Sequence, residues 1–316
     1  MFSGGLDEAS TLSIDKKILL VSHMELGKEH SDQKSILKYC RENNIFSNKY
    51  EQVLLNAGLK PHSWNIKTPT ESTFRSRSLL FFAAGIYIAN KISPQCQLIV
   101  PENGTISINI PLDSGRRSSC STRTTHPTFI KRIQEALYTI GISNSIYNPY
   151  RLKSKADMVL ECCQDTSKKA ILKSLVDLSC SCAKRGHNVF WDKSGIEIRN
   201  AKIKHCGMCL PCLYRRVALD TIGLDNEALL GTDVLHGIKF NLDNKHQKRN
   251  RDFNALLYFL KNRMNERTIR QELFFNGIIE KQELDEYTSL ALHSYRQVIN
   301  WLKKKATNEI QIRAGI

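Results

Sequence analysis

The stretch HCGMCLPCLYRR, residues 205–216, contains two consecutive C-x-x-C steps. Cys206, Cys209 and Cys212 fit a single turn of chain around a metal ion. Gly207 permits the tight turn that brings three sulfurs to one point. A structural zinc ion takes four ligands, so the stretch predicts a zinc site that draws a fourth ligand from elsewhere in the chain. A redox C-x-x-C pair is a poorer interpretation, because it does not explain the third cysteine.

The fourth ligand is expected from LSCSCAKRG, which supplies both Cys180 and Cys182. Between the two cysteine stretches, residues 188–199 (NVFWDKSGIEIR) alternate in polarity around a central Lys-Ser-Gly, which predicts a β-hairpin that returns the chain. His205 is a weaker ligand candidate, because it adjoins Cys206. We take Cys180 as the fourth ligand and Cys182 as its alternative.

Composition decides how the cysteines are interpreted. The chain has 316 residues, 41% of them hydrophobic, and ten cysteines, which is enough for a large core in one domain with an appendage or in two domains. The most apolar run, residues 79–89, is too short to span a bilayer, and the N-terminus lacks the features of a secretory signal. We therefore expect a cytoplasmic protein without membrane association, in which clustered cysteines bind metal rather than form disulfides.

A helix is expected directly after the cysteines. Pro211 suits a first helical turn, and the apolar residues that follow recur at helical spacing until Gly223. Arg215 and Arg216 would therefore lie on a helix fixed at one end by metal. Two interpretations of these arginines remain open: contact with an anionic ligand, or exposure to water.

The N-terminal Ser-Gly-Gly-Leu-Asp, residues 3–7, is the second informative stretch. Its backbone N–H groups can turn towards a phosphate, and a helix that starts there adds its positive end. The apolar run KKILLVSH, residues 16–23, predicts a buried strand that ends at Ser22 and His23. Loop, helix and strand in this order are typical of an α/β nucleotide-binding unit.

Together the two stretches resemble a known family. Residues 3–7 are similar to the SGGxDS pyrophosphate loop of the N-type ATP pyrophosphatases, and the cysteine motif with Arg215 resembles the zinc motif of the 7-cyano-7-deazaguanine synthase (QueC) family. The biosynthetic enzyme has an aspartate-rich loop in the middle of the chain. This chain has PENGTISINIPL and SCSTRTTHPTFI instead, which resemble stretches of the QueC-like proteins of Qat anti-phage systems. The resemblance covers roughly residues 3–232.

The resemblance implies a fold and a set of sites. The fold is α/β: a Rossmann-like parallel sheet of the adenine nucleotide alpha hydrolase (HUP) type in residues 1–179, a zinc-binding module in 180–232 and a helical C-terminal region in 233–316. The cofactors are Zn²⁺, ATP and Mg²⁺. The implied ATP-binding residues are Ser3, Gly4, Gly5, Leu6, Asp7, Ser22 and His23. The implied catalytic residues are Asp7, Arg77, Arg123, His126 and Lys155.

Residues 121–126 (STRTTH) are a candidate substrate site from their own chemistry. Hydroxyl and cationic side chains gather just before Pro127 and an amphipathic helix, as at the mouth of a site. His126 could transfer a proton, and Arg123 could bind phosphate or carboxylate. Glu102 and Asn109, in a strand-like stretch, could approach the same mouth. The alternative is a capped loop in water.

The resemblance implies a carboxylate-activating enzyme. It would adenylate the acid, release pyrophosphate and support amide, nitrile or protein-conjugation chemistry on a deazapurine-type molecule or a protein terminus. Its partners would be other proteins of the same defence system. The alternative is a degraded scaffold that binds those partners, favoured by Glu8 in place of the usual serine and by the absence of a buried strand before Ser3. Intact Asp7 favours the enzyme.

The remaining features are the charge and the C-terminus. A formal net charge of +15 is spread along the chain, which fits an anionic nucleotide or a nucleic acid equally well. Residues 252–264 and 287–304 show apolar stripes of helical period, and we expect two helices there with Tyr258, Phe259 and Trp301 in the core.

Overall fold

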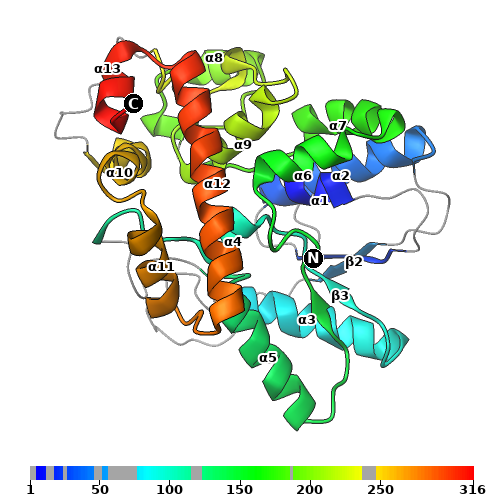
Figure 1. The fold of residues 1–316 in the computed structure, drawn as a ribbon. Coiled ribbons are helices and arrows are strands. Elements are labelled where there is room, and N and C mark those ends of the chain that lie inside the picture. Colours follow the sequence, from blue (N-terminus) through cyan, green and yellow to red (C-terminus); the bar gives the residue numbers. More distant parts are fainter. Residues whose placement is uncertain are drawn as a thin grey trace, which may run out of the picture.

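The computed structural model describes residues 5–11, 18–23, 27–45, 52–55, 77–114, 123–185, 188–236 and 247–316. These residues are mostly helical, with two short strand pairs beside the helices (Figure 1). None of the described helices combines the length and apolar character that a bilayer crossing requires. The helices are α1 (Leu6–Thr11), α2 (Gly27–Glu42), α3 (Arg77–Ile92), α4 (Gly104–Ile108), α5 (Pro127–Thr139), α6 (Lys155–Cys162), α7 (Thr166–Leu178), α8 (Gly195–Asn200), α9 (Leu210–Asp220), α10 (Gln247–Asn262), α11 (Glu266–Phe275), α12 (Lys281–Lys305) and α13 (Asn308–Ala314).

Both described strand pairs are parallel. Strand β1 (Leu20–His23) pairs with β2 (Gln52–Leu55), and β3 (Leu98–Ile99) pairs with β4 (Ile146–Tyr147). Parallel neighbours need a crossover connection, and α2 supplies one between β1 and β2, while α4 and α5 lie in the chain between β3 and β4. The predicted strand at the end of residues 16–23 and the predicted α/β class are confirmed to this extent.

The segment that contains Cys206, Cys209 and Cys212 shares one hydrophobic cluster with the C-terminal helices. The long helix α12 crosses the centre of the molecule, with α9 on one side and α11 on the other (Figure 1). Phe259 of α10 and Trp301 of α12 are buried, as predicted, whereas Tyr258 is 54% exposed, which corrects its assignment to the core. The cluster also includes Cys206, Cys209, Cys212, Leu213, Val217, Phe253, Leu256, Tyr295, Val298 and Leu302.

The predicted hairpin over residues 188–199 is wrong. This segment forms a short 3-10 helix, Asn188–Phe190, and then α8. The reason is a capping box: the Ser194 hydroxyl accepts from the Glu197 N–H at 3.3 Å, and the Glu197 carboxylate accepts from the Ser194 N–H at 2.7 Å. This local helix signal prevails over the alternating polarity.

The strand-like stretch around residues 101–112 also forms a helix. Asn103 caps α4 by accepting from the Ile106 N–H at 3.1 Å. At the other end Asn109 adopts the left-handed region, with φ of 37°, and terminates the helix. This single turn places Asn103 and Ser107 at opposite ends of a rigid spacer about 6 Å long, from a rise of about 1.5 Å per residue.

Candidate metal centre and the adjoining Asp7–Lys155 site

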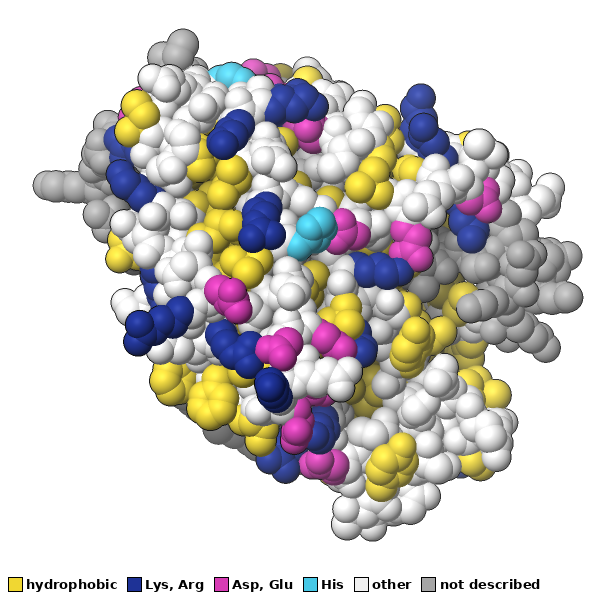
Figure 2. Space-filling model, in the orientation of Figure 1, with side chains coloured by type: hydrophobic (Ala, Val, Ile, Leu, Met, Phe, Trp, Pro, Cys, Tyr) yellow, Lys and Arg dark blue, Asp and Glu magenta, His cyan; other side chains and the backbone are white. Residues whose placement is uncertain are grey.

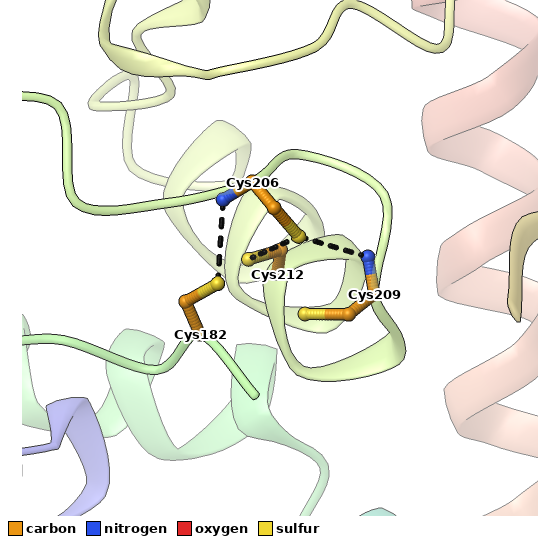
Figure 3. Close-up of side chains that lie close together, drawn as sticks. All are labelled: Cys182, Cys206, Cys209 and Cys212. Atoms are coloured by element: carbon orange, nitrogen blue, oxygen red, sulfur yellow. Dashed lines mark hydrogen bonds between the residues drawn. The ribbon is translucent and has the colours of Figure 1, made fainter. Parts of the chain in front are cut away.

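Four cysteine sulfurs converge in the interior. The Sγ atoms of Cys182, Cys206, Cys209 and Cys212 all lie within 4.8 Å of one another (Figure 3). The Cys206 and Cys212 sulfurs are 3.8 Å apart, too far for a disulfide of about 2.05 Å. Four sulfurs at about 2.3 Å from a tetrahedral zinc ion would be separated by about 3.8 Å. The arrangement therefore has the ligand type, number and spacing of a structural metal centre.

The turn at Gly207 brings together three of the four cysteines: Cys206, Cys209 and Cys212. Its φ is +82°, which favours glycine. An added Cβ would also lie 2.2 Å from the Thr232 carbonyl oxygen, which leaves no room for a side chain. The turn directs the N–H groups of Met208 and Cys209 at the Cys206 sulfur, at 3.4 and 3.3 Å. Cys209 occupies the N-cap position of α9, and the first turn of this helix contains Pro211. The predicted turn and the predicted helix are both confirmed.

The thiols of the cluster perturb one another. Hydrogen bonds from the thiols of Cys182, Cys209 and Cys212 hold the pKa of Cys206 well below its ordinary value. Burial raises the pKa of Cys209 and of Cys212 well above theirs. Several thiolates cannot be buried together without a compensating cation. A divalent ion at the centre would supply that compensation.

The structure places Cys182, and not Cys180, beside the other three cysteines. The Cys182 sulfur accepts from the Cys206 N–H at 3.3 Å (Figure 3). The Cys180 thiol instead donates to the Lys204 carbonyl oxygen at 3.8 Å. The first-choice ligand Cys180 is thereby replaced by its alternative. His205 stays outside the cluster, since its Nε2 accepts from the Ser181 N–H at 3.3 Å.

Neither arginine of α9 faces water. Arg215 is 5% exposed and Arg216 is 1% exposed. The Arg216 guanidinium donates to Asp225 at 3.1 Å and to Glu227 at 2.7 Å, and it lies over the Trp301 ring. The solvent-facing interpretation of these arginines is therefore wrong: Arg215 contacts the end of α7 and the segment after it, and Arg216 contacts the acidic side chains after α9 and the Trp301 ring.

We expect Gly207→Ala to destabilise the protein far more than Gly223→Ala. Both glycines have positive φ, but a Cβ at Gly223 meets nothing within 4 Å. The control therefore carries only the backbone cost of about 1–2 kcal/mol, while Gly207→Ala adds a clash with the Thr232 carbonyl. Denaturant unfolding of both variants measures the difference. Equal losses of stability would contradict the close approach.

A buried ion pair lies at the start of α1. The Lys155 ammonium donates to Asp7 Oδ1, and both side chains are nearly inaccessible. Asn103 donates to Asp7 Oδ2 from its backbone N–H at 3.1 Å and from its side chain at 2.8 Å. Burial alone would raise the pKa of Asp7, but the Lys155 charge and these hydrogen bonds lower it below its ordinary value. Asp7 is therefore ionised, and it connects the start of α1 to the start of α6 and to the turn before α4.

The structure describes only some of the other predicted nucleotide-site residues. Gly5 precedes α1 and Leu6 is fully buried. Ser22, in β1, is buried, and its hydroxyl accepts from Gln52 at 2.9 Å. Ser3 and Gly4, and the side chains of Glu8, His23 and Arg77, lie outside the described residues.

Helix α4 links Asp7 to the STRTTH segment. Asn103, at its N-terminus, contacts Asp7, and Ser107, in its last turn, lies 3.0 Å from the Thr125 hydroxyl. Asn148 joins this network through Ser107 at 3.4 Å. Of the segment, Arg123 to His126 are described, and Thr125 contacts α4 about one helical turn from Asn103, the residue that contacts Asp7.

The C-terminal helices also touch this segment. Arg123 donates to the Asn276 side chain, and Thr128 donates to the Gly277 carbonyl oxygen at 3.0 Å. Both partners lie in the turn between α11 and α12. Burial lowers the pKa of Arg123. The region beyond residue 232 therefore shapes the candidate substrate site, although the sequence indicates only a packing role for it.

His126 is buried in its neutral form. Its Nδ1 accepts from the Thr128 N–H at 3.3 Å, and its Nε2 has no hydrogen-bond partner among the described residues. Burial, with a smaller contribution from Arg123, lowers the pKa of His126 to about 4. With Nδ1 as the acceptor, Nε2 carries the ring hydrogen and can donate a hydrogen bond to a bound group.

This depressed pKa predicts an acid sensitivity. Between pH 6.5 and about 4 the unfolded chain gains a proton at His126 that the folded chain excludes, so stability falls as the pH falls. From pH 7.5 to 5 the parent should lose about 2 kcal/mol more than His126→Asn, which can still accept from Thr128. Urea unfolding at both pH values measures this difference. Parallel losses in the two proteins would contradict a buried neutral imidazole.

Sequence reasoning missed two site residues, Asn103 and Asn276, and ranked a third, Cys182, behind Cys180. Asn103 lies between the named candidates Glu102 and Asn109, and an asparagine before a glycine-led apolar segment is a helix-cap signal that was available. Cys182 was an alternative that spacing could not separate from Cys180. Asn276 gave no signal, because its contact with Arg123 spans 153 positions.

Comparisons with known protein families, with curated proteins and with solved structures find no match. On the face drawn in Figure 2, Lys and Arg side chains alternate with Asp and Glu and form no continuous basic stripe. That face gives no particular support to a nucleic-acid partner.

Proposed function

We propose that this chain is an ATP-dependent enzyme of the QueC-like type, which activates a carboxylate by adenylation. The Asp7–Lys155 pair, joined by Asn103, is the observation that carries the proposal. It brings together the start of α1, the start of α6 and the turn before α4, and a Rossmann-like nucleotide site of the HUP type would use these elements. The family resemblance of the sequence also implies both Asp7 and Lys155, which lie 148 positions apart.

A structural zinc ion is part of the proposal. Cys182, Cys206, Cys209 and Cys212 would hold it, and four thiolates leave no open position for catalysis. Helix α9, capped at the metal centre, packs against α6, which begins at Lys155. The metal would thus hold in place the helix that presents the cation to the nucleotide.

The residues divide the work of adenylation. Lys155 and Arg123 would stabilise negative charge on the phosphates, while the carboxylate oxygen attacks the α-phosphorus and pyrophosphate leaves. Both oxygens of Asp7 already accept hydrogen bonds, so its role is to fix the loop rather than to bind Mg²⁺ directly. The Nε2–H of His126 would donate a hydrogen bond to the acyl oxygen during attack by an amine, whose proton passes to water as AMP leaves.

The substrate would be a deazapurine-type carboxylate, with an amine or a protein terminus as acceptor and other proteins of an anti-phage system as partners. The second candidate function is a non-catalytic scaffold that binds those partners. The full engagement of Asp7 by Lys155 and Asn103 favours it, because such a closed network also suits a purely structural role.

Pyrophosphate release separates the two functions. The purified chain, with ATP, Mg²⁺ and a 7-deazapurine carboxylate, should form AMP and pyrophosphate. Lys155→Arg, which keeps the charge but not the geometry, should lower the rate by about 10²–10³-fold, and Lys153→Arg should leave it unchanged. An absence of AMP from zinc-loaded, folded protein, with its cognate partners added, would favour the scaffold.

A further inference from the structure

Arg215 is a buried cation without a carboxylate partner. Its guanidinium donates to the Ser179 hydroxyl at 3.0 Å, to the Ser181 hydroxyl at 3.5 Å and to the Val176 carbonyl oxygen. Within the described part of the chain, no carboxylate oxygen lies within the 4.0 Å of an ion pair. The neighbouring Arg216, by contrast, pairs with Asp225 and Glu227.

A lone buried guanidinium is costly unless negative charge lies nearby. Neutral hydroxyl and carbonyl groups satisfy its hydrogen bonds but do not balance its charge. Burial lowers the pKa of Arg215, and the nearby charges that oppose this shift include the Cys212 sulfur and the carboxylates of Asp177 and Asp7. The Cys180 thiol donates to the Lys204 carbonyl oxygen and is uncharged. The cysteine cluster is therefore one source of negative charge for Arg215.

The metal centre would carry that charge. A divalent ion with four thiolates has a net charge of −2, which an apolar surrounding does not stabilise. Cys212 precedes Arg215 by three residues on α9, so the two side chains lie on the same face, one helical turn apart. Arg215 therefore lies one helical turn from a ligand of the centre, close to the negative charge that the centre would carry.

The same side chain also spans the two segments that build the centre. Cys212 and Arg215 belong to α9, whereas Ser179 and Ser181 lie three positions and one position before Cys182, the ligand from the other segment. The guanidinium thus connects the helix with one ligand to the loop with another. Cys182 is the ligand that joins the cluster from a distance of more than twenty positions in the chain.

We propose that Arg215 is the counter-ion and clamp of the metal–thiolate centre, balancing its negative charge and holding the Cys182 loop against α9. The inference rests on the proposed zinc site. Arg215 is a positioning residue in this role, and it acts on metal affinity rather than on chemistry. A partner outside the first ligand shell that orients or balances a ligand typically contributes about 10–100-fold to metal affinity.

Co²⁺ binding to the full chain tests the proposal. Arg215→Gln removes the charge, Arg215→Lys keeps it, and Ser179→Ala removes one anchor while the charge remains. Arg215→Gln should weaken Co²⁺ affinity about 10–100-fold, measured by chelator competition. It should also shift the midpoint of metal loss to higher pH and shift the thiolate-to-cobalt charge-transfer band. Arg215→Lys and Ser179→Ala should stay within a few-fold of the parent.

Each outcome has a distinct meaning. A parent chain that takes up no Co²⁺ or Zn²⁺ removes the proposed metal site itself. A parent that binds metal while folded Arg215→Gln binds equally well overturns the counter-ion role alone. If Arg215→Gln does not fold, Arg215→Lys decides: near-parental affinity supports the role of charge, and a loss of 10-fold or more overturns it.

Discussion

Cys209→Ser abolishes stoichiometric zinc binding and unfolds the chain around the metal centre. Structural zinc contributes about 10–16 kcal/mol in small peptide sites, which is as large as the net stability of about 5–15 kcal/mol of an ordinary domain. Because the cysteines belong to the same hydrophobic cluster as α10 and α12, the loss should extend into the C-terminal helices. Elemental analysis and thermal unfolding, with and without a chelator, measure both effects.

Cys180→Ser is the matched control. Its sulfur lies two positions from Cys182 but bonds to the Lys204 carbonyl oxygen and not to the cluster. This variant should retain one zinc per chain and a nearly parental unfolding temperature, whereas Cys182→Ser should behave like Cys209→Ser. Loss of zinc from Cys180→Ser, or full zinc retention by Cys209→Ser, would contradict the ligand set.

Lys155→Met should cost about 3–5 kcal/mol of folding stability, because it leaves the Asp7 carboxylate buried without its cation. Asp7→Asn combined with Lys155→Met should cost much less than the sum of the single changes, since the double variant buries no unpaired charge. Urea unfolding of the two single variants and the double variant gives this coupling free energy directly.

Lys153→Met is the control for that cycle. Lys153 pairs with Glu161 at the surface, where their side chains are 37% and 52% exposed, and such pairs contribute less than about 1 kcal/mol. Additive effects of the Asp7 and Lys155 changes would mean that the buried pair does not hold the N-terminal segment to α6.

The features predicted correctly from sequence have local causes. The turn at Gly207 and the start of α9 at Pro211 depend on neighbouring residues alone, and both appear as expected. The hairpin prediction failed where two local signals compete, because the capping box from Ser194 to Glu197 outweighs the alternating polarity.

The features that could not be predicted depend on distant contacts. The sequence position of either Cys180 or Cys182 allows it to supply the fourth ligand. Only the packing of the loop places Cys182, and not Cys180, in the cluster. The burial of Arg216 depends on Asp225, nine positions away on the far side of a turn. The contact between Asn103 and Asp7 spans 96 positions, beyond the reach of any local pattern.

A metal ion held by the four cysteines should stabilise the Asp7–Lys155 site. The physical link is a second hydrophobic cluster in which Leu6 of α1, Met158 of α6 and Leu219 of α9 pack together. Hydrogen exchange of the full chain, with zinc bound and after chelation, tests this link most directly. We predict that metal removal increases exchange in α9 and also in α6 and α1. Unchanged protection of α6 and α1 in zinc-free protein would contradict the claim.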